Sequence, residues 1–192
     1  MQRSQFRINS NQIITNNEYH VELIKDSDVV IDAGANAGIF SIFAAINHSK
    51  ATIYAFEPTP FTFDILERNT QYYPNIRCFN AALGDKCGPT TIVEAPCPTM
   101  NFVGVGGIPI EMRTIDSLDI PLNLLKMDTE WYEANILKGA AETIRKYKPI
   151  IAMSAYHKPE DKEELPKLLN SISPYDCELR HDCEEEFICK PL

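Results

Sequence analysis

Two carboxylates and a glycine-rich turn form the first group of residues that could bind a ligand. The segment VVIDAGANAGIF at 29–40 is an apolar run that ends in Asp32, followed by a turn that contains Gly34 and Gly38. Glu57 closes the next apolar run. In an α/β protein such a turn lies at the carboxyl end of a strand, and a carboxylate after the second strand can accept hydrogen bonds from both hydroxyls of a ribose. These residues therefore predict a site for a ligand with a nucleoside part.

The residue types in this turn argue against a dinucleotide. A pyrophosphate cradle has the pattern G-x-G-x-x-G, whereas this turn reads D-x-G-x-N-x-G and puts the charge of Asp32 where a phosphate would be repelled. A carboxylate there suits a cation, Asn36 offers both a donor and an acceptor, and the glycines let the backbone approach a ligand closely. S-adenosylmethionine has a nucleoside end and a cationic, phosphate-free end, so it fits. A purely structural turn and a solvated Glu57 are the alternatives.

A second group of residues could act on a hydroxyl group. Asp128 and Glu130 follow one predicted strand and His157 follows the next, so we expect all three at the same edge of a parallel sheet. A general base accelerates such a transfer by roughly a hundred- to ten-thousand-fold, and an imidazole takes up a proton near neutral pH. The alternatives are helix-start roles for the two carboxylates, a loop-capping role for His157, and a Mg²⁺ site. Because D-x-E is a short and common pattern, we predict no metal site.

Apolar patterns predict the elements that must position these residues. The expected strands cover 28–33, 51–58, 75–83, 122–128 and 149–157, with a closing pair at 175–180 and 185–190, and the expected helices cover 38–47, 61–69, 133–147 and 160–172, the last kinked at Pro166. Residues 84–113 add a small β excursion and a Pro- and Gly-rich loop at 95–108 that could close over an acceptor. Alternating strands and helices predict an α/β fold with a doubly wound, mostly parallel sheet. The closing pair predicts an antiparallel last strand at or near the sheet edge.

Length, charge and cysteine usage narrow the class of protein. The chain has 192 residues and a formal net charge of −9, which disfavours nucleic acid as a partner. It has no apolar run of 18 residues, and its first ten residues lack the apolar core of a signal peptide, so we expect a soluble, cytoplasmic protein without a membrane span. Six cysteines are present without a C-x-x-C pair. We therefore expect reduced thiols, with Cys177 and Cys189 as small half-buried strand residues.

Several motifs occur together in a recognisable order. They are VVIDAGANAGIFSI, YAFEPTP, NAALGDKCG, TIDSL, LLKMDTEWYEANILKGA and AYHKPED. From about residue 25 to the C-terminus the chain resembles the FkbM family of class I S-adenosylmethionine-dependent methyltransferases. The resemblance implies a Rossmann-like, seven-stranded sheet with an antiparallel last strand, in a single domain over 1–192 with a catalytic core at 25–192 and an N-terminal extension at 1–24. It also implies methyl transfer to a hydroxyl oxygen of a sugar, a glycan or a secondary metabolite.

The same resemblance implies roles for individual residues. Asp128 would stand close to the transferred methyl group, and Trp131 occupies a position where the family commonly has glycine, so that its indole would narrow the acceptor pocket or form a stacking wall. The residues expected to line the cofactor are Asp32, Gly34, Ala35, Asn36 and Gly38 at the methionine end, Glu57 and Pro58 at the ribose, and Asn80 and Ala81 near adenine. A non-catalytic S-adenosylmethionine-binding scaffold and a nicotinamide-dependent reductase are the competing interpretations. The oligomeric state is not indicated.

Overall fold

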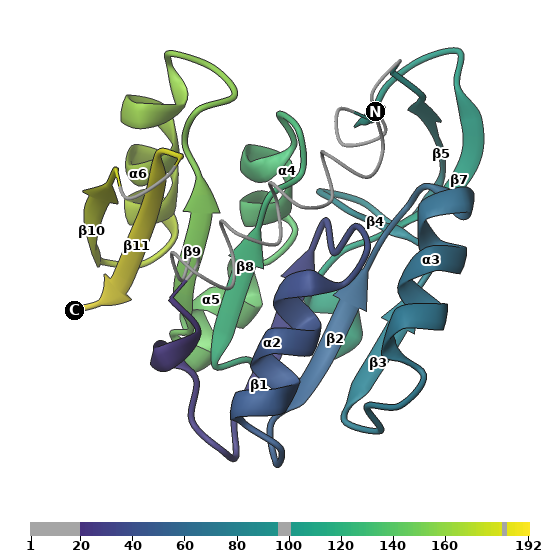
Figure 1. The fold of residues 1–192 in the computed structure, drawn as a ribbon. Helices are drawn as coiled ribbons and strands as arrows, with labels where there is room; N and C mark the ends of the chain where they lie inside the picture. Colours follow the sequence, from purple (N-terminus) through teal and green to yellow (C-terminus); the bar gives the residue numbers. More distant parts are fainter. Residues whose placement is uncertain (1–19, 96–100, 182–183) are drawn as a thin grey trace.

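A seven-stranded sheet forms the centre of the protein (Figure 1). The computed structural model describes residues 20–95, 101–181 and 184–192. The strand order is β10-β11-β9-β8-β1-β2-β3, and the bounds are β1 Val29–Ala33, β2 Thr52–Phe56, β3 Ile76–Phe79, β8 Leu124–Met127, β9 Ile150–Ser154, β10 Tyr175–Arg180 and β11 Glu186–Pro191. Neighbours from β9 to β3 pair in parallel, whereas β11 is antiparallel to both β9 and β10. The predicted fold class is confirmed, with the last strand one place from the edge.

Helices cover both faces of this sheet because its central strands are apolar on both sides. Figure 1 shows α2 and α3 in front of the sheet and α4, α5 and α6 behind it. The helices are α2 Ile39–Asn47, α3 Pro60–Thr70, α4 Glu133–Lys138, α5 Ala141–Tyr147 and α6 Asp161–Ile172, with short 3₁₀ turns η2 Val21–Leu23 and η4 Asp116–Leu118. Successive residues of β1 point to opposite faces, so that Val30 packs with Phe40 of α2 and Ile31 packs with Ile136 of α4.

The order of the strands defines where a ligand can bind. The chain passes from β1 to β2 on one side of β1, and later returns to place β8 on its other side. Such a reversal opens a crevice at the carboxyl ends of the strands. The residues after β1, β2 and β8 therefore meet at one edge, the upper edge in Figure 1.

Three expected elements differ in the structure. The predicted strand 75–83 is divided into β3 and β4 (Ala82–Leu83), which belongs to a second, four-stranded sheet with β5 Gly88–Val93, β6 Phe102–Val103 and β7 Ile108–Arg113. The predicted loop 95–108 thus contains β6 and the start of β7, and residues 96–100 lie outside the described residues. The predicted helix 133–147 is two helices. A Cβ at Gly139 would lie 1.9 Å from the Gly84 carbonyl oxygen, and Asp116 accepts the N–H groups of Glu142 and Thr143 at the start of α5.

The closing hairpin contains a disulfide bond that contradicts the expectation of reduced thiols. Cys177 of β10 lies directly opposite Cys189 of β11, with their Cα atoms 4.0 Å apart, and the two sulfurs are bonded. The sequence pattern identified two strands but not their register, so it could not show that these cysteines face each other. Cys78 and Cys87 are free, and Cys97 and Cys183 lie outside the described residues.

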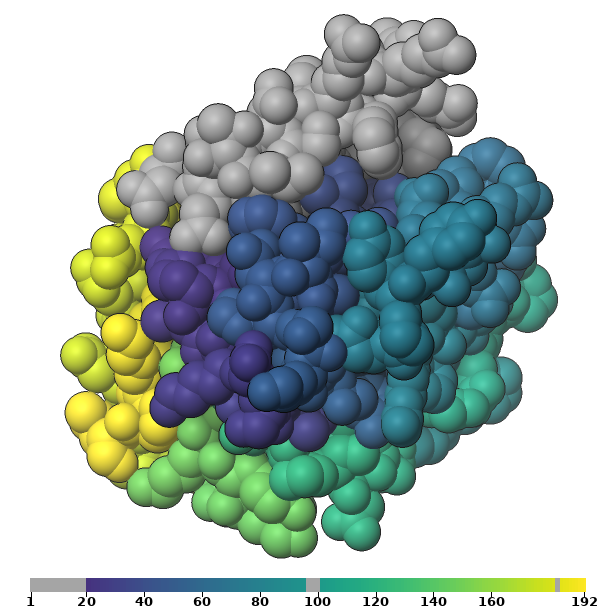
Figure 2. Space-filling model, turned by 60° about the horizontal axis from the view of Figure 1, so that its bottom comes forward, coloured from purple at the N-terminus to yellow at the C-terminus, as the bar shows by residue number. Residues whose placement is uncertain are grey.

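The end of the predicted N-terminal extension packs against the core. Val21 and Ile24 are buried and belong to a cluster with Phe40 of α2 and Ile188 of β11. Figure 2 shows this purple segment between the yellow C-terminal strands and the blue α2. Residues 1–19 lie outside the described residues. In the portion of the chain that is described, no helix combines the length and the apolarity needed to cross a bilayer.

A buried ion pair joins the two strands on which the crevice depends. Asp32 of β1 and Lys126 of β8 are opposite each other in the sheet, and Lys126 Nζ lies 3.0 Å from Asp32 Oδ1. The two side chains are 0% and 4% exposed. Removal of one partner from such a pair leaves an uncompensated charge in the interior.

We predict that Lys126→Met lowers the free energy of unfolding by about 3–5 kcal/mol, because Asp32 would lose its buried counter-ion. Urea unfolding followed by circular dichroism measures this change. Lys50→Met is the matched control, since Lys50 is 79% exposed and lies 4.0 Å from Asp26, and it should have a much smaller effect. Equal unfolding free energies for the two variants would contradict the prediction.

Candidate functional site

The turn after β1 is held tightly against the ends of β2 and β8. The N–H groups of Gly34 and Ala35 both donate to the carbonyl oxygen of Phe56, at 3.0 and 2.9 Å. Gly34 has a φ of +76°, and a Cβ there would lie 1.9 Å from the carbonyl oxygen of Asp128. Glycine is thus required for packing within the protein, in addition to any close approach of a ligand. The turn also includes Asn36 in the left-handed region, with a φ of 51°.

Asp32 lies beneath this turn and does not reach the surface. Its carboxylate accepts a hydrogen bond from Ser41 Oγ at 2.7 Å and is paired with Lys126. Lys126 Nζ also donates to the carbonyl oxygen of Gly34, at 3.1 Å. The cation that faces Asp32 in this structure is therefore the lysine, so Asp32 can influence a ligand only through the turn that it supports.

Glu57 lies at the end of β2 and faces the turn. Its Oε2 accepts the N–H of Asn36 at 3.0 Å and its Oε1 accepts the N–H of Thr59 at 2.9 Å. Burial raises the pKa of this carboxyl, and these hydrogen bonds oppose the increase. Each oxygen has a second lone pair, so the carboxylate has the acceptor capacity for two hydroxyl groups. This donor and acceptor chemistry fits the ribose of S-adenosylmethionine.

The other residues expected near the cofactor differ in their accessibility. Asn80 is exposed, and its Nδ2 donates to the carbonyl oxygens of Glu57 and Pro58 at 2.9 and 3.1 Å, which braces the segment after β2. Ala81 is buried in the main core. Gly38 begins α2 with a φ of +84°, and a Cβ there would meet Leu66 of α3. The structure thus brings the turn, Glu57 and Asn80 together at one edge, while Ala81 and Gly38 serve packing.

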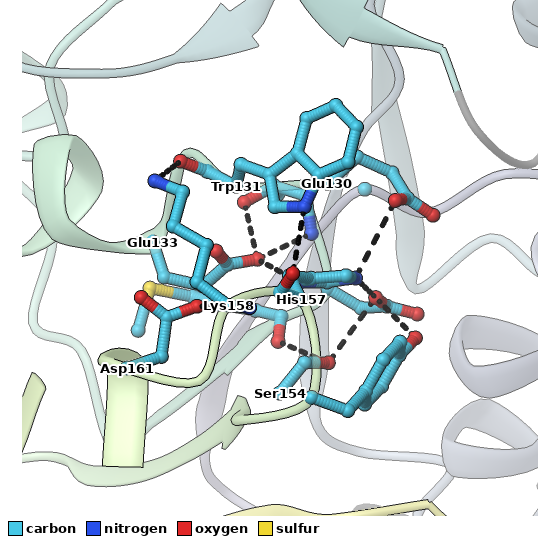
Figure 3. Close-up of polar contacts among 12 residues, drawn as sticks. Glu130, Trp131, Glu133, Ser154, His157, Lys158 and Asp161 are labelled. Atoms are coloured by element: carbon cyan, nitrogen blue, oxygen red, sulfur yellow. Dashed lines mark hydrogen bonds and ion pairs between the residues drawn. The ribbon is translucent and has the colours of Figure 1, made fainter. Parts of the chain in front are cut away.

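Asp128, Glu130 and His157 come together at the ends of β8 and β9, as their spacing predicts. His157 Nε2 lies 3.5 Å from Asp128 Oδ1 and 3.5 Å from Glu130 Oε2. A further carboxylate, Glu133 of α4, lies on the other side of the ring, with Oε1 3.4 Å from Nδ1. Figure 3 shows Glu130 and Glu133 on opposite sides of the imidazole. We name Asp128, Glu130, Glu133 and His157 the acid–histidine cluster.

The surroundings shift the pKa values of two members of this cluster in the same direction. Burial would lower the pKa of His157, but the carboxylates of Glu133, Asp128 and Glu130 outweigh this effect and raise it to about 9. Burial raises the pKa of Glu130 to about 7, and His157 opposes this increase. These shifts favour a protonated imidazole at neutral pH and make the Glu130 carboxylate a stronger base than an ordinary glutamate.

The carboxylate of Asp128 accepts hydrogen bonds from two side chains. Ser154 Oγ and Tyr156 Oη each donate to Asp128 Oδ1 at 3.1 Å. Burial, followed by the charge of Asp128, raises the pKa of the Tyr156 hydroxyl, so this group stays a donor.

In the described parts of the chain, no three His, Cys, Asp or Glu side chains have an arrangement that could hold a metal ion.

Trp131 lies beside the cluster. Its backbone has a conformation that is uncommon for a residue with a side chain. Its φ is 74°, in the region that favours glycine, and the preceding Glu130 has a φ of 49°. The indole Nε1 donates to the carbonyl oxygen of His157 at 3.0 Å, and the ring centroid lies 5.3 Å from that of Phe102 in β6. Trp131 is 38% exposed. Trp131 and Phe102 thus form an aromatic pair between the β8–α4 loop and the small sheet. That this pair lines an acceptor pocket stays a prediction.

Sequence analysis missed several residues that shape the site. Lys126 could have been noticed as a charge inside the apolar run LNLLKMD, because a buried lysine needs a counter-ion. Glu133 stands in the first turn of a helix, where an acid is common for reasons of the helix dipole alone. Ser154 and Tyr156 lie at the end of an apolar strand and carry no pattern of their own.

Comparison with known proteins agrees with the geometry. A model of the methyltransferase FkbM domain matches residues 32–179. The chain is similar to the hexuronic acid methyltransferase AglP of Haloferax volcanii, with 28% identity over 159 residues that cover 78% of this chain and 64% of that protein. It is also similar to the 31-O-demethyl-FK506 methyltransferase FkbM of Streptomyces tacrolimicus, with 35% identity over 78 residues, or 40% of this chain and 30% of that protein. The chain therefore matches less than two thirds of the length of these relatives.

Solved structures show the same fold. The methyltransferase FkbM from Methylobacillus flagellatus KT superimposes with a TM-score of 0.69 at 24% identity, covering 86% of this chain and 44% of that one. A precorrin-6y C5,15-methyltransferase from Geobacter metallireducens GS-15 superimposes with a TM-score of 0.62 at 14% identity, covering 90% and 84%. At these identities the likeness concerns the class I methyltransferase fold alone. Because the domain match spans most of the chain, the chain belongs to the FkbM family of methyltransferases.

Proposed function

We propose that the protein transfers a methyl group from S-adenosylmethionine to a hydroxyl oxygen of a sugar or of a secondary metabolite. The observation that carries the proposal is the single edge at which the Glu57 carboxylate, the turn after β1 and the acid–histidine cluster meet. The names of two relatives support it, since one is a hexuronic acid methyltransferase and the other a 31-O-demethyl-FK506 methyltransferase.

In this proposal the chain contributes binding, orientation and proton transfer. When bound, S-adenosylmethionine supplies a methyl group that is already activated by a sulfonium. Glu57 accepts hydrogen bonds from the ribose, and the turn at 34–38 supports the methionine end. The acid–histidine cluster then orients the acceptor hydroxyl, and positioning of this kind can lower a barrier by roughly 7–11 kcal/mol.

Isothermal titration calorimetry with three ligands tests the proposal. S-adenosylmethionine and S-adenosylhomocysteine should bind, and NAD should not, because the turn lacks the G-x-G-x-x-G pattern. A methyl-transfer screen over hydroxylated sugars, glycans and small metabolites should then release S-adenosylhomocysteine with at least one class of acceptor. Binding without transfer to any of these classes would instead favour a non-catalytic scaffold, and preferential binding of NAD would contradict the proposal.

For the cofactor side, we predict that Glu57→Ala weakens S-adenosylmethionine binding by about ten- to over a hundredfold. The change removes a charged acceptor of two hydrogen bonds, worth roughly 1.5–3 kcal/mol. Calorimetry measures the dissociation constant, and circular dichroism checks the fold. Glu67→Ala is the control, because Glu67 is exposed on α3, and it should bind as the wild type does. An unchanged dissociation constant in a folded Glu57→Ala protein would remove Glu57 from the site.

For the acceptor side, we predict that Trp131→Gly changes the KM for the acceptor, or the range of acceptors, while S-adenosylmethionine affinity stays within about threefold. Glycine suits the φ of 74° but loses the ring contact with Phe102 and the hydrogen bond to His157. Steady-state kinetics with the acceptors from the screen measure the effect. Unaltered acceptor kinetics, or a loss confined to cofactor binding, would show that Trp131 does not face the acceptor.

A further inference from the structure

The imidazole of His157 is buried, and within the described residues neither of its nitrogens makes a hydrogen bond, although both face carboxylates at ion-pair distance. Its side chain is 3% exposed. Nδ1 faces Glu133, and Nε2 faces both Asp128 and Glu130, all at 3.4–3.5 Å. A general base needs a lone pair within hydrogen-bond reach of the proton that it removes. With a carboxylate at each nitrogen, the ring is suited to carry a charge between the carboxylates.

Glu133 is the most deeply buried carboxylate of the cluster. Its Oε1 accepts the backbone N–H of Thr129 at 2.8 Å and the hydroxyl of the same residue at 3.0 Å. The side chain is 2% exposed, so it cannot contact a ligand directly. Glu133 can influence the reaction only through the groups that it holds, and the ring of His157 is one of them.

Glu130 is the carboxylate of the cluster to which, among the described residues, no hydrogen bond is donated. Asp128 Oδ1 already accepts hydrogen bonds from Ser154 and Tyr156. Glu130 Oε2 faces His157, and its side chain is 19% exposed. Glu130 therefore has unused lone pairs and access to solvent, to which a proton can leave.

We propose that Glu133 is a positioning residue that holds His157 as an imidazolium between Asp128 and Glu130, so that Glu130, and not the imidazole, takes the proton of the acceptor hydroxyl. This inference rests on the proposed methyl transfer. In that step the acceptor oxygen forms a bond to the methyl carbon while the carbon–sulfur bond breaks and its electron pair stays on sulfur. The hydroxyl proton passes to a Glu130 carboxylate oxygen and from there to water.

The pH dependence follows from the same groups. Several ionisable side chains surround the His157 ring. They are Asp128 and Glu130 after β8, Glu133 of α4, Asp161 of α6, Glu184 before β11, and the two chain neighbours of His157, Tyr156 and Lys158. Glu130 has to be ionised, and its pKa is raised to about 7. His157 has to be protonated, and its pKa is raised to about 9. Turnover should thus rise through about pH 7 and fall again above about pH 9.

Nuclear magnetic resonance of the full chain, labelled with ¹⁵N in its imidazoles, tests the positioning role without cofactor or acceptor. The His157 signal is assigned by its loss in His157→Asn. In the wild type it should stay protonated at pH 7.5. Glu133→Gln keeps the shape and an acceptor oxygen for Thr129 but removes the charge, so the pKa of His157 should fall by about 1 to 2 pH units. Glu142→Gln, on the exposed surface of α5, should change nothing.

A conservative variant and a pH profile complete the test. Glu133→Asp should keep the pKa of His157 raised, which separates loss of charge from loss of fold. With an acceptor from the screen, Glu130→Gln should abolish the rise in turnover near pH 7 with little change in S-adenosylmethionine affinity. A His157 that is neutral at pH 7.5 in the wild type, or that titrates alike in wild type and Glu133→Gln, would overturn the inference. Failure to bind S-adenosylmethionine in calorimetry would overturn the proposed function instead.

Discussion

The buried pair of Asp32 and Lys126 is the interaction on which the rest of the site depends. It links opposite positions of the two central strands β1 and β8, at the point where the direction of chain crossing reverses. Ser41 of α2 completes the contacts of the carboxylate, and the lysine also binds the carbonyl oxygen of Gly34. One strand pair, one helix and the turn after β1 are thus joined at a single buried ion pair. Ion pairs of this kind add little net stability over apolar packing, so our hypothesis is that this pair contributes a defined geometry.

Both halves of the candidate site are arranged around this pair. On one side, the N–H of Asn36 donates to the Glu57 carboxylate and the N–H of Gly34 donates to the carbonyl oxygen of Phe56 at the end of β2, which fixes the position of that carboxylate. On the other side, the N–H of Asp128 donates to the carbonyl oxygen of Ala33, and the carbonyl group of Asp128 packs against Gly34. The first residue of the acid–histidine cluster is therefore in contact with the start of the turn. A change in the position of β8 relative to β1 would move Glu57 and the acid–histidine cluster relative to each other. The glycine at 34 permits the contact, because a side chain there would occupy the space of the Asp128 carbonyl.

The spacing of apolar residues, and the turn residues between the apolar segments, predict most of the sheet. Buried parallel strands need continuous apolar runs, and the helices between them need one apolar face. The same reasoning places Asp32, Glu57, Asp128 and His157 at strand ends. It fails where a tertiary contact decides. The helix break at Gly139 depends on the Gly84 carbonyl, and the disulfide depends on the register of β10 and β11. The ionisation of His157 depends on three carboxylates from two segments, including Glu133, whose position in the chain looks like an ordinary helix start.

A crystal structure of the full chain with S-adenosylhomocysteine tests the central claim most directly. The account predicts that both ribose hydroxyls lie within hydrogen-bond distance of the Glu57 carboxylate, with the turn at 34–38 beside the amino-acid end. It further predicts that the sulfur faces the side on which Asp128 and Glu130 lie. A nucleoside bound elsewhere on the molecule, or a sulfur directed away from the acid–histidine cluster, would contradict it.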